Sequence, residues 1–188
     1  MGTLGPNNGG TFADDATVGT IAWTNPSNAS ASDNIYATAS LLATQITHYL
    51  KSTNFGFAIP TDATVIGVTV DIERSQTGVG AAVNDSSVKL VKGGTISGNE
   101  KATGTTYPTT DAYATYGSAS DLWGLTLTPA DINLSTFGVV IASTDTVAGT
   151  AQIDHVRITI DYTGSNRGTN QNKYFRVGAG MSRSEGGS

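Results

Sequence analysis

The chain has 188 residues, of which 13% are charged, and it contains 23 glycines, no cysteine and a formal net charge of −5. This length is enough for one domain with a substantial hydrophobic core. The lack of cysteine excludes disulfides, thiolate zinc sites and thiol catalysis, and the acidic charge argues against general binding to nucleic acid, which needs clustered Lys and Arg.

Residues 1–16 are rich in Gly, Asn and Asp, a composition that predicts a flexible N-terminal arm. They contain neither the basic nor the apolar part of a signal peptide, and no apolar run in the chain reaches the roughly 18 residues of a membrane span. We therefore expect synthesis in the cytoplasm and no membrane contact. Order is expected to begin at residues 18–23, where Trp23 is the first candidate for the core.

Alternation of apolar and polar residues is the clearest structural signal, and it is strongest in residues 64–73 and 153–162. A period of two is typical of half-buried antiparallel strands. In the second segment the phase changes before Val156, which predicts a β-bulge. Further strands are expected in residues 36–50, as two strands with a break near Leu42, and in residues 54–60, 88–92, 122–127 and 137–142.

Two segments differ from this pattern. Thr128, Pro129 and Asp131 combine an N-cap, a first-turn proline and an acidic third residue, which predicts a helix of about one turn. Residues 95–120 are rich in Thr, Gly and Tyr, and we expect them to form loops and short edge pieces that are available for interactions.

Together these segments predict an all-β fold, namely an antiparallel β-sandwich of jelly-roll type with roughly 8–10 strands, over residues 17–162. Residues 163–188 are expected to form a basic, polar C-terminal tail. The tail carries a net charge of +3, whereas residues 1–162 carry −8. An acidic protein surface is therefore a more natural partner for the tail than nucleic acid.

Catalytic chemistry finds little support. The two histidines, His48 and His155, are not accompanied by a nucleophile elbow of G-x-S-x-G form. Four acidic residues make two candidate acid/base pairs for glycoside cleavage: Asp71 with Glu73, and Asp154 with Asp161. A face of solvated acids beside an apolar row explains the first pair more simply.

Several loop carboxylates and amides are of the kind that Ca²⁺ prefers, but they lack the spacing of an EF-hand loop. These residues are Asp14, Asp15, Asn84, Asp85 and Asp145. We therefore predict no enzymatic activity, no catalytic residue, no cofactor and no metal ligand.

Aromatic residues offer an alternative, binding role. Tyr107, Tyr113 and Tyr116 lie in the Thr-rich segment and are candidates for an exposed surface on which a sugar stacks, as in a glycan-binding module of a tail fibre or adhesin. Trp23 and Trp123 lie beside apolar strand residues and are expected in the core instead.

A series of landmarks along residues 12–162 resembles a group of β-sandwich proteins found in bacteriophage structural gene clusters. The landmarks are Ile21-Ala22-Trp23, Asn25-Pro26, Ser32-Asp33-Asn34, Tyr36-Ala37, Phe55-Gly56-Phe57, Ile59-Pro60, Ala63-Thr64-Val65-Ile66-Gly67-Val68, Asp121-Leu122-Trp123-Gly124, Asp131-Ile132-Asn133, Phe137-Gly138-Val139 and Ile153-Asp154-His155-Val156-Arg157-Ile158. The resemblance implies a structural protein of the virion surface, most simply a capsid decoration protein that stabilises subunit contacts, or else a tail or fibre part. No catalytic residues follow from it.

Such proteins commonly act as symmetric oligomers, so we expect a homo-oligomer, with a trimer favoured, and the major capsid protein as an additional partner. Within the tail, Tyr174, Phe175, Arg176 and Val177 are the candidate subunit contact, inserted as a strand against a neighbour. Arg167, Lys173, Arg176 and Arg183 would then meet the neighbour's acidic surface. A tail or linker without such contacts is the alternative.

Overall fold

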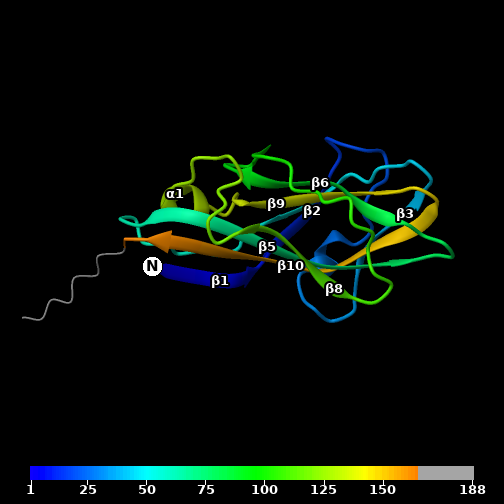
Figure 1. Cartoon of the computed structure of the whole chain (residues 1–188), viewed down its shortest axis with the longest axis horizontal. Coiled ribbons are helices and arrows are strands. Elements are labelled where there is room, and N and C mark those ends of the chain that lie inside the picture. Colours follow the sequence, from blue (N-terminus) through cyan, green and yellow to red (C-terminus); the bar gives the residue numbers. More distant parts are fainter. Residues whose placement is uncertain (165–188) are drawn as a thin grey trace, which may run out of the picture.

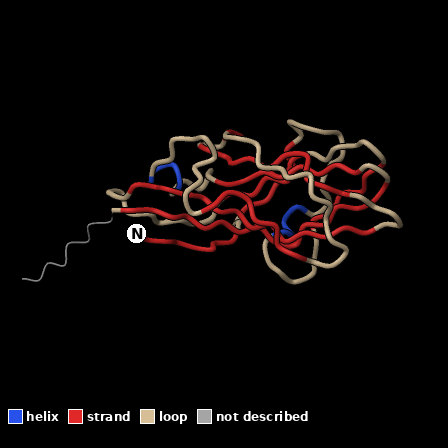
Figure 2. The backbone as a smooth tube through the Cα atoms, viewed as in Figure 1, coloured by secondary structure: helices blue, strands red, loops and turns tan. Residues whose placement is uncertain are grey.

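The computed structural model describes residues 1–164, which form two five-stranded antiparallel sheets packed face to face (Figures 1 and 2). The predicted all-β sandwich of jelly-roll type is confirmed. The residues of the predicted tail contact, Tyr174, Phe175, Arg176 and Val177, lie outside the described residues. None of the helices in residues 1–164 is long and apolar enough to cross a membrane.

The first sheet is organised around its longest strand, β10. It comprises β1 (Gly2–Asn8), β3 (Ala37–Leu42), β5 (Thr64–Thr77), β8 (Ala112–Ser118) and β10 (Ala148–Thr163). One side of β10 pairs with β5 along nearly its whole length, and the other side pairs with β1 and β3 in turn. Beyond β5 lies β8, which is an edge of this sheet.

The second sheet has the order β2–β4–β9–β6–β7. Its strands are β2 (Thr11–Asp15), β4 (Tyr49–Thr53), β6 (Val83–Lys92), β7 (Thr95–Ser97) and β9 (Gly138–Asp145). The core lies between the two sheets and is built from the inward rows of the central strands, such as Val68, Val70 and Ile72 of β5. The alternation seen in the sequence therefore marks the face that each strand buries.

The N-terminal arm is the main correction to the expected fold. Residues 2–8 and 11–15 are not a flexible lead but form β1 and β2, paired with β10 and β4 respectively. An edge strand obtains much of its stability from backbone hydrogen bonds, so it needs few apolar side chains. Leu4 and Phe12 are the apolar side chains of the arm that pack against the core.

Other local predictions have mixed outcomes. The break near Leu42, the bulge before Val156 and the capped helical turn are confirmed, the last as α1 (Pro129–Ile132) with a capping box at Thr128. Residues 54–60 and 122–127 are not strands, and a second short helix, η1 (Pro26–Ala29), was not predicted. In residues 122–127, Trp123 adopts a left-handed backbone (φ 57°), which ends any extended run.

Candidate functional site

Three neighbouring strands, β8, β5 and β10, present a continuous set of side chains on the outer face of the first sheet. The strand register places Tyr113, Glu73 and His155 in one row across them. Tyr113 Oη and His155 Nδ1 lie 2.8 Å apart. Burial lowers the pKa of His155, and Arg157 acts in the same direction, so the imidazole is neutral at pH 7.

The neighbouring row consists of Thr115, Asp71 and Arg157. The Thr115 hydroxyl donates to Asp71 Oδ1 at 2.6 Å, and Arg157 Nε donates to Asp71 Oδ2 at 3.1 Å. The Arg157 guanidinium also lies 4.0 Å from the centre of the Tyr113 ring. Because both oxygens of Asp71 are engaged in this row, the geometry gives no support to an acid/base pair of Asp71 and Glu73.

A bulge in β10 determines which side chains reach this face. The register with β5 shifts between Ile153 and His155, so Asp154 is the extra residue. A bulge changes the direction of the side chain that it carries. Asp154 is only 1% exposed, and its Oδ2 accepts the backbone N–H of Asn34 at 3.1 Å.

Glu73, Asp111 and Asp154 together form what we call the acidic cluster. The negative charges of all three carboxylates raise the pKa of the Tyr36 hydroxyl. This hydroxyl donates to Asp111 Oδ2 at 2.6 Å. This hydrogen bond is the largest cause that raises the pKa of Tyr36 to about 12. The pKa of Asp154 is raised first by burial and further by the charges of Glu73 and Asp111.

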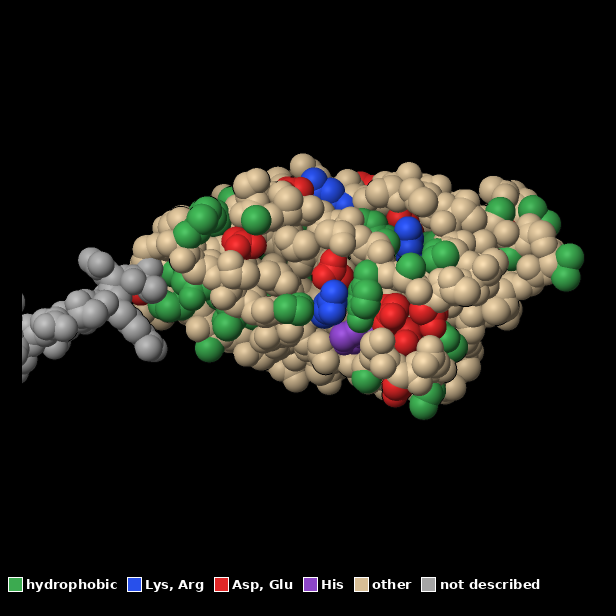
Figure 3. All heavy atoms as spheres, turned by 60° about the horizontal axis from the view of Figure 1, so that its bottom comes forward, with side chains coloured by type: hydrophobic (Ala, Val, Ile, Leu, Met, Phe, Trp, Pro, Cys, Tyr) green, Lys and Arg blue, Asp and Glu red, His purple; other side chains and the backbone are tan. Residues whose placement is uncertain are grey.

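Each carboxylate of the acidic cluster has one buried oxygen without a hydrogen-bond partner among the described residues. These atoms are Glu73 Oε2, Asp111 Oδ1 and Asp154 Oδ1, and the neighbouring His155 Nε2 is also unpartnered. Buried polar atoms are normally satisfied. Four unpartnered atoms in one place therefore distinguish this region from an ordinary sheet surface, and Figure 3 shows acidic side chains gathered beside a histidine on this face.

The basic residues of the described chain are engaged elsewhere. The ion pairs are Lys51 with Asp15, Arg74 with Asp85, Lys92 with Asp131, Lys101 with Asp121 and Arg157 with Asp71. Lys89, on the second sheet, makes no ion pair within residues 1–164. The acidic cluster thus has no cationic partner in the part of the chain that the structure describes.

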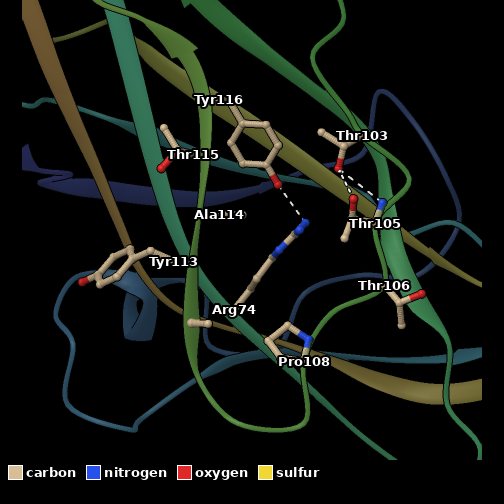
Figure 4. Close-up of a pocket in the computed structure, with 10 residues that line it drawn as sticks. Arg74, Thr103, Thr105, Thr106, Pro108, Tyr113, Ala114, Thr115 and Tyr116 are labelled. Carbon is tan, nitrogen blue, oxygen red and sulfur yellow. Dashed lines mark hydrogen bonds between the residues drawn. The ribbon is translucent and has the colours of Figure 1, made fainter.

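A groove of about 340 Å³ runs beside the acidic cluster, along the free edge of β8. The opposite wall is the segment that contains Thr103, Thr105 and Thr106. Figure 4 shows Arg74 and Tyr116 pointing toward this segment, whereas the Tyr113 side chain points away from it. Tyr113 is therefore at the rim, where the groove and the acidic cluster meet.

Arg74, at the base of the groove, is fixed by an ion pair, a hydrogen bond and a cation–π contact. It pairs with the buried Asp85, donates to the hydroxyl of Tyr116 at 2.8 Å, and places its guanidinium 4.3 Å from the centre of the Tyr107 ring. Because Asp85 neutralises its charge, Arg74 contributes a rigid and electrically balanced floor rather than a binding site for anions.

The predicted tyrosine surface is wrong for two of its three members. Tyr107 and Tyr116 are 1% and 3% exposed, and only Tyr113 reaches the surface, with 37% exposed. The reason is Arg74, which lies between the two buried rings, an arrangement that cation–π attraction stabilises. Nothing in the local sequence of residues 107–116 indicates this partner, which lies on β5.

The remaining candidates have structural roles. Trp23 and Trp123 are buried as expected, at 4% and 0% exposed. His48 contacts Asp14 at 2.7 Å, and within residues 1–164 no serine or threonine hydroxyl bonds to either imidazole. Asp161 accepts the Thr3 hydroxyl at 2.6 Å on the exposed face near the end of β10, well along the strand from Asp154.

The loop carboxylates of the kind that Ca²⁺ prefers take part in separate local interactions. Asp15 caps the turn at Thr17, and Asp145 accepts the N–H groups of Ala82 and Val147. Among the residues described, no three His, Asp or Glu side chains converge as a metal site would require.

No protein-family model and no curated protein matches the chain. Two solved structures are similar in shape. One is the module TmCBM61 in complex with β-1,4-galactotriose, with 14% identity and a TM-score of 0.38 over 79% of this chain and 86% of that one. The other is the CBM1 module of BiXyn10A without ligand, with 9% identity and a TM-score of 0.38 over 81% of this chain and 99% of that one. At these values nothing about the ligand of this chain follows from either.

Proposed function

We propose that the chain is a non-catalytic structural protein of a bacteriophage virion surface, which stabilises the particle by contacts between copies of itself and with the capsid. The resemblance of residues 12–162 to proteins of phage structural gene clusters supports this role. The observation that carries it in the structure is the open edge of β8.

The edge of β8 is unprotected, whereas the other edge strands of the two sheets are protected. Its seven residues, Ala112–Ser118, contain no charge and no proline. Apart from the ladder to β5, the described chain provides no backbone partner for residues 112–117. Soluble proteins normally protect such an edge, because it can pair with a strand of another chain.

The other edge strands show what protection looks like. β1 contains Pro6, β2 ends in Asp14 and Asp15, and β7 has only three residues. β3 is bridged on its outer side by Thr24. The contrast supports the proposal that the edge of β8 binds a partner, and a symmetric assembly of identical copies, such as a trimer, would provide one.

The test is the molar mass of the full chain by light scattering over a range of concentrations. We expect an oligomer that Thr115→Lys dissociates, because a charge at an exposed position of β8 blocks strand addition. Thr159→Lys is the matched control, since it places the same charge on the same sheet face but in its central strand. The proposal would be contradicted if the wild-type chain were a monomer at every concentration, or if Thr115→Lys left the molar mass of an oligomer unchanged.

The location on a particle needs its own experiment. Gold-labelled antibody against the protein should decorate the surface of intact virions produced by the corresponding phage cluster. If the label were found only on cell debris, the protein would not be a virion component, and only the proposed assembly of copies along β8 would stand.

A second candidate, a glycan-binding module, is favoured by one observation. The groove offers threonine hydroxyls on its far wall and the exposed ring of Tyr113 at its rim, and sugar sites commonly combine such polar and aromatic groups. A glycan array should then show a signal that Tyr113→Ala removes and Thr159→Lys leaves. The variants Tyr107→Ala and Tyr116→Ala are unsuitable, because both rings belong to the core.

A further inference from the structure

The acidic cluster carries negative charge that no cationic side chain in residues 1–164 compensates. Glu73, Asp111 and Asp154 have adjoining charges, and each has a buried oxygen without a partner. Burial of an uncompensated carboxylate is costly. A cluster of this kind becomes favourable when a cation with hydrogen-bond donors enters it.

The donor geometry indicates the kind of cation. No three acidic or histidine side chains in the described chain converge on one metal position. An ammonium or guanidinium group presents several N–H donors over a wider span, so it can reach oxygens that are too far apart to coordinate one ion. The cluster therefore suits the side chain of a lysine or an arginine.

The charge distribution of the chain indicates where this side chain comes from. In residues 1–164, five of the six Lys and Arg side chains are paired with other aspartates, and the sixth, Lys89, lies on the second sheet. Residues 165–188 contribute four basic side chains and a net charge of +3. Charge complementarity thus connects the acidic cluster with the C-terminal residues.

The position of the cluster favours the C-terminal residues of another copy. Tyr113 belongs both to the β8 edge and to the row of Glu73, so a strand added to β8 passes directly beside the cluster. The route within one chain is long. Glu73 pairs with His155, nine residues before Gly164, which is about 30 Å along a strand. Within one chain, the residues beyond Gly164 would have to reverse and stay fully extended for all nine positions to Lys173 in order to cover that length.

We propose that the acidic cluster of Glu73, Asp111 and Asp154 is a receptor for a basic side chain, Lys173 or Arg176, from residues 165–188 of a second copy. The proposal rests on the proposed function in one respect, namely that copies assemble along β8. Lys173 and Arg176 flank Tyr174 and Phe175, so a strand that pairs with β8 carries its charges and its apolar side chains together.

A zero-length cross-linking experiment tests the assignment directly. Carbodiimide joins a carboxylate to a lysine amine only when the two are in contact. In a mixture of ¹⁴N- and ¹⁵N-labelled full chain, we expect Lys173 to couple to Glu73 or Asp111, with peptides of mixed label. Lys173→Arg should remove the cross-link without dissociating the oligomer, because Arg keeps the charge but does not react.

The matched binding measurement uses Glu73→Gln with Asp111→Asn in the full chain. Loss of two charge-assisted contacts should weaken assembly at least tenfold, and the control, Asp161→Asn, removes a charge from the same face near the end of β10 and should have little effect. Circular dichroism confirms that both variants fold.

The outcomes separate this inference from the proposed function. An oligomer that keeps its affinity in the double variant, or cross-links that join Lys173 to other acids or only within one chain, would overturn the receptor and leave assembly along β8 standing. A wild-type monomer would overturn both.

Discussion

The buried pair of Arg74 and Asp85 shows how strongly a single residue can shape this fold. Both side chains are at most 5% exposed, and the guanidinium also contacts Tyr107 and Tyr116. When one partner of such a pair is removed, the other remains as an uncompensated buried charge, which costs more than the pair itself contributes.

Arg74→Met should therefore lower the free energy of unfolding by about 3–5 kcal/mol. The matched control is Lys101→Met, which breaks the partly exposed pair with Asp121 and should cost less than about 1 kcal/mol. Urea denaturation monitored by tryptophan fluorescence measures both. Similar losses in the two variants would show that the Arg74 pair is no more important than a surface contact.

In contrast to the Arg74–Asp85 pair, the ionised side chain of Asp154 should destabilise the folded state. Its pKa is raised in the folded state by burial and by neighbouring carboxylates, so its ionised form opposes folding. Below the unfolded-state pKa both states hold the proton and the penalty is absent, whereas it grows as the pH rises through the folded-state pKa and is complete above it.

We expect Asp154→Asn to raise the free energy of unfolding at pH 7 by on the order of 1 kcal/mol, or about 2–4 °C in Tm. The advantage over the wild type should disappear near pH 3. Thermal melts of the monomeric Thr115→Lys background across this pH range test the prediction without interference from assembly. A variant that is less stable at pH 7 would mean that the Asp154 charge is already compensated.

Among the elements, β8 depends on a tight contact with the turn at Trp123. Gly117 has a φ of 73°, and a Cβ there would meet the Val68 carbonyl and approach the Trp123 Nε1 at 2.6 Å. That indole nitrogen donates to Val68 O at 2.9 Å. Gly117 thus lets the edge strand pass over a buried tryptophan.

Gly117→Ala should lower the free energy of unfolding by about 1–2 kcal/mol because of the left-handed backbone. Overpacking against Trp123 should lower it by about 1–3 kcal/mol more. Gly93→Ala provides the control, since it has a φ of 57° and open space around its Cβ position, so it should show only the backbone cost. Chemical denaturation of both variants gives the difference. Equal costs would indicate that the contact with Trp123 relaxes freely.

The elements also show which parts of the fold can be predicted from the sequence. β5 and β10 have long apolar rows, and their alternation and the bulge in β10 were predictable. β8 was missed as a regular strand, because Ala112–Ser118 has only one buried side chain, Tyr116, to reveal its alternation. β1 and β2 were missed for the related reason that backbone pairing, which leaves little trace in composition, holds them.

The acidic cluster cannot be predicted from the sequence, although two of its members are candidates there in separate acidic pairs. Glu73 and Asp154 are 81 positions apart in sequence, and only the register of β5 with β10 and the exact place of the bulge bring them together. Similarly, proximity in sequence predicts one exposed surface for the three tyrosines, whereas Arg74 holds Tyr107 and Tyr116 in the core and leaves only Tyr113 exposed.

At the scale of the whole molecule, three features lie together on one side of the sandwich. The open edge of β8, the groove and the acidic cluster share Tyr113. Together they provide backbone hydrogen bonds, space and negative charge for an extended basic segment. We accordingly expect the assembly to weaken as salt concentration rises from 50 mM to 500 mM, because added ions screen the charged contacts. Sedimentation velocity over this series measures it, and an assembly that salt strengthens would indicate a mainly apolar interface elsewhere.

Hydrogen exchange of the β8 amides tests most directly the central claim that copies assemble along this edge. The full chain should be compared in its assembled state and in the Thr115→Lys variant. The account predicts that amides in residues 112–118 exchange more slowly in the assembly, because the outward-facing ones acquire carbonyl partners, while those of β1 and β2 do not change. Unchanged exchange in β8 within a stable oligomer would contradict the account, because the copies would then be joined through another surface.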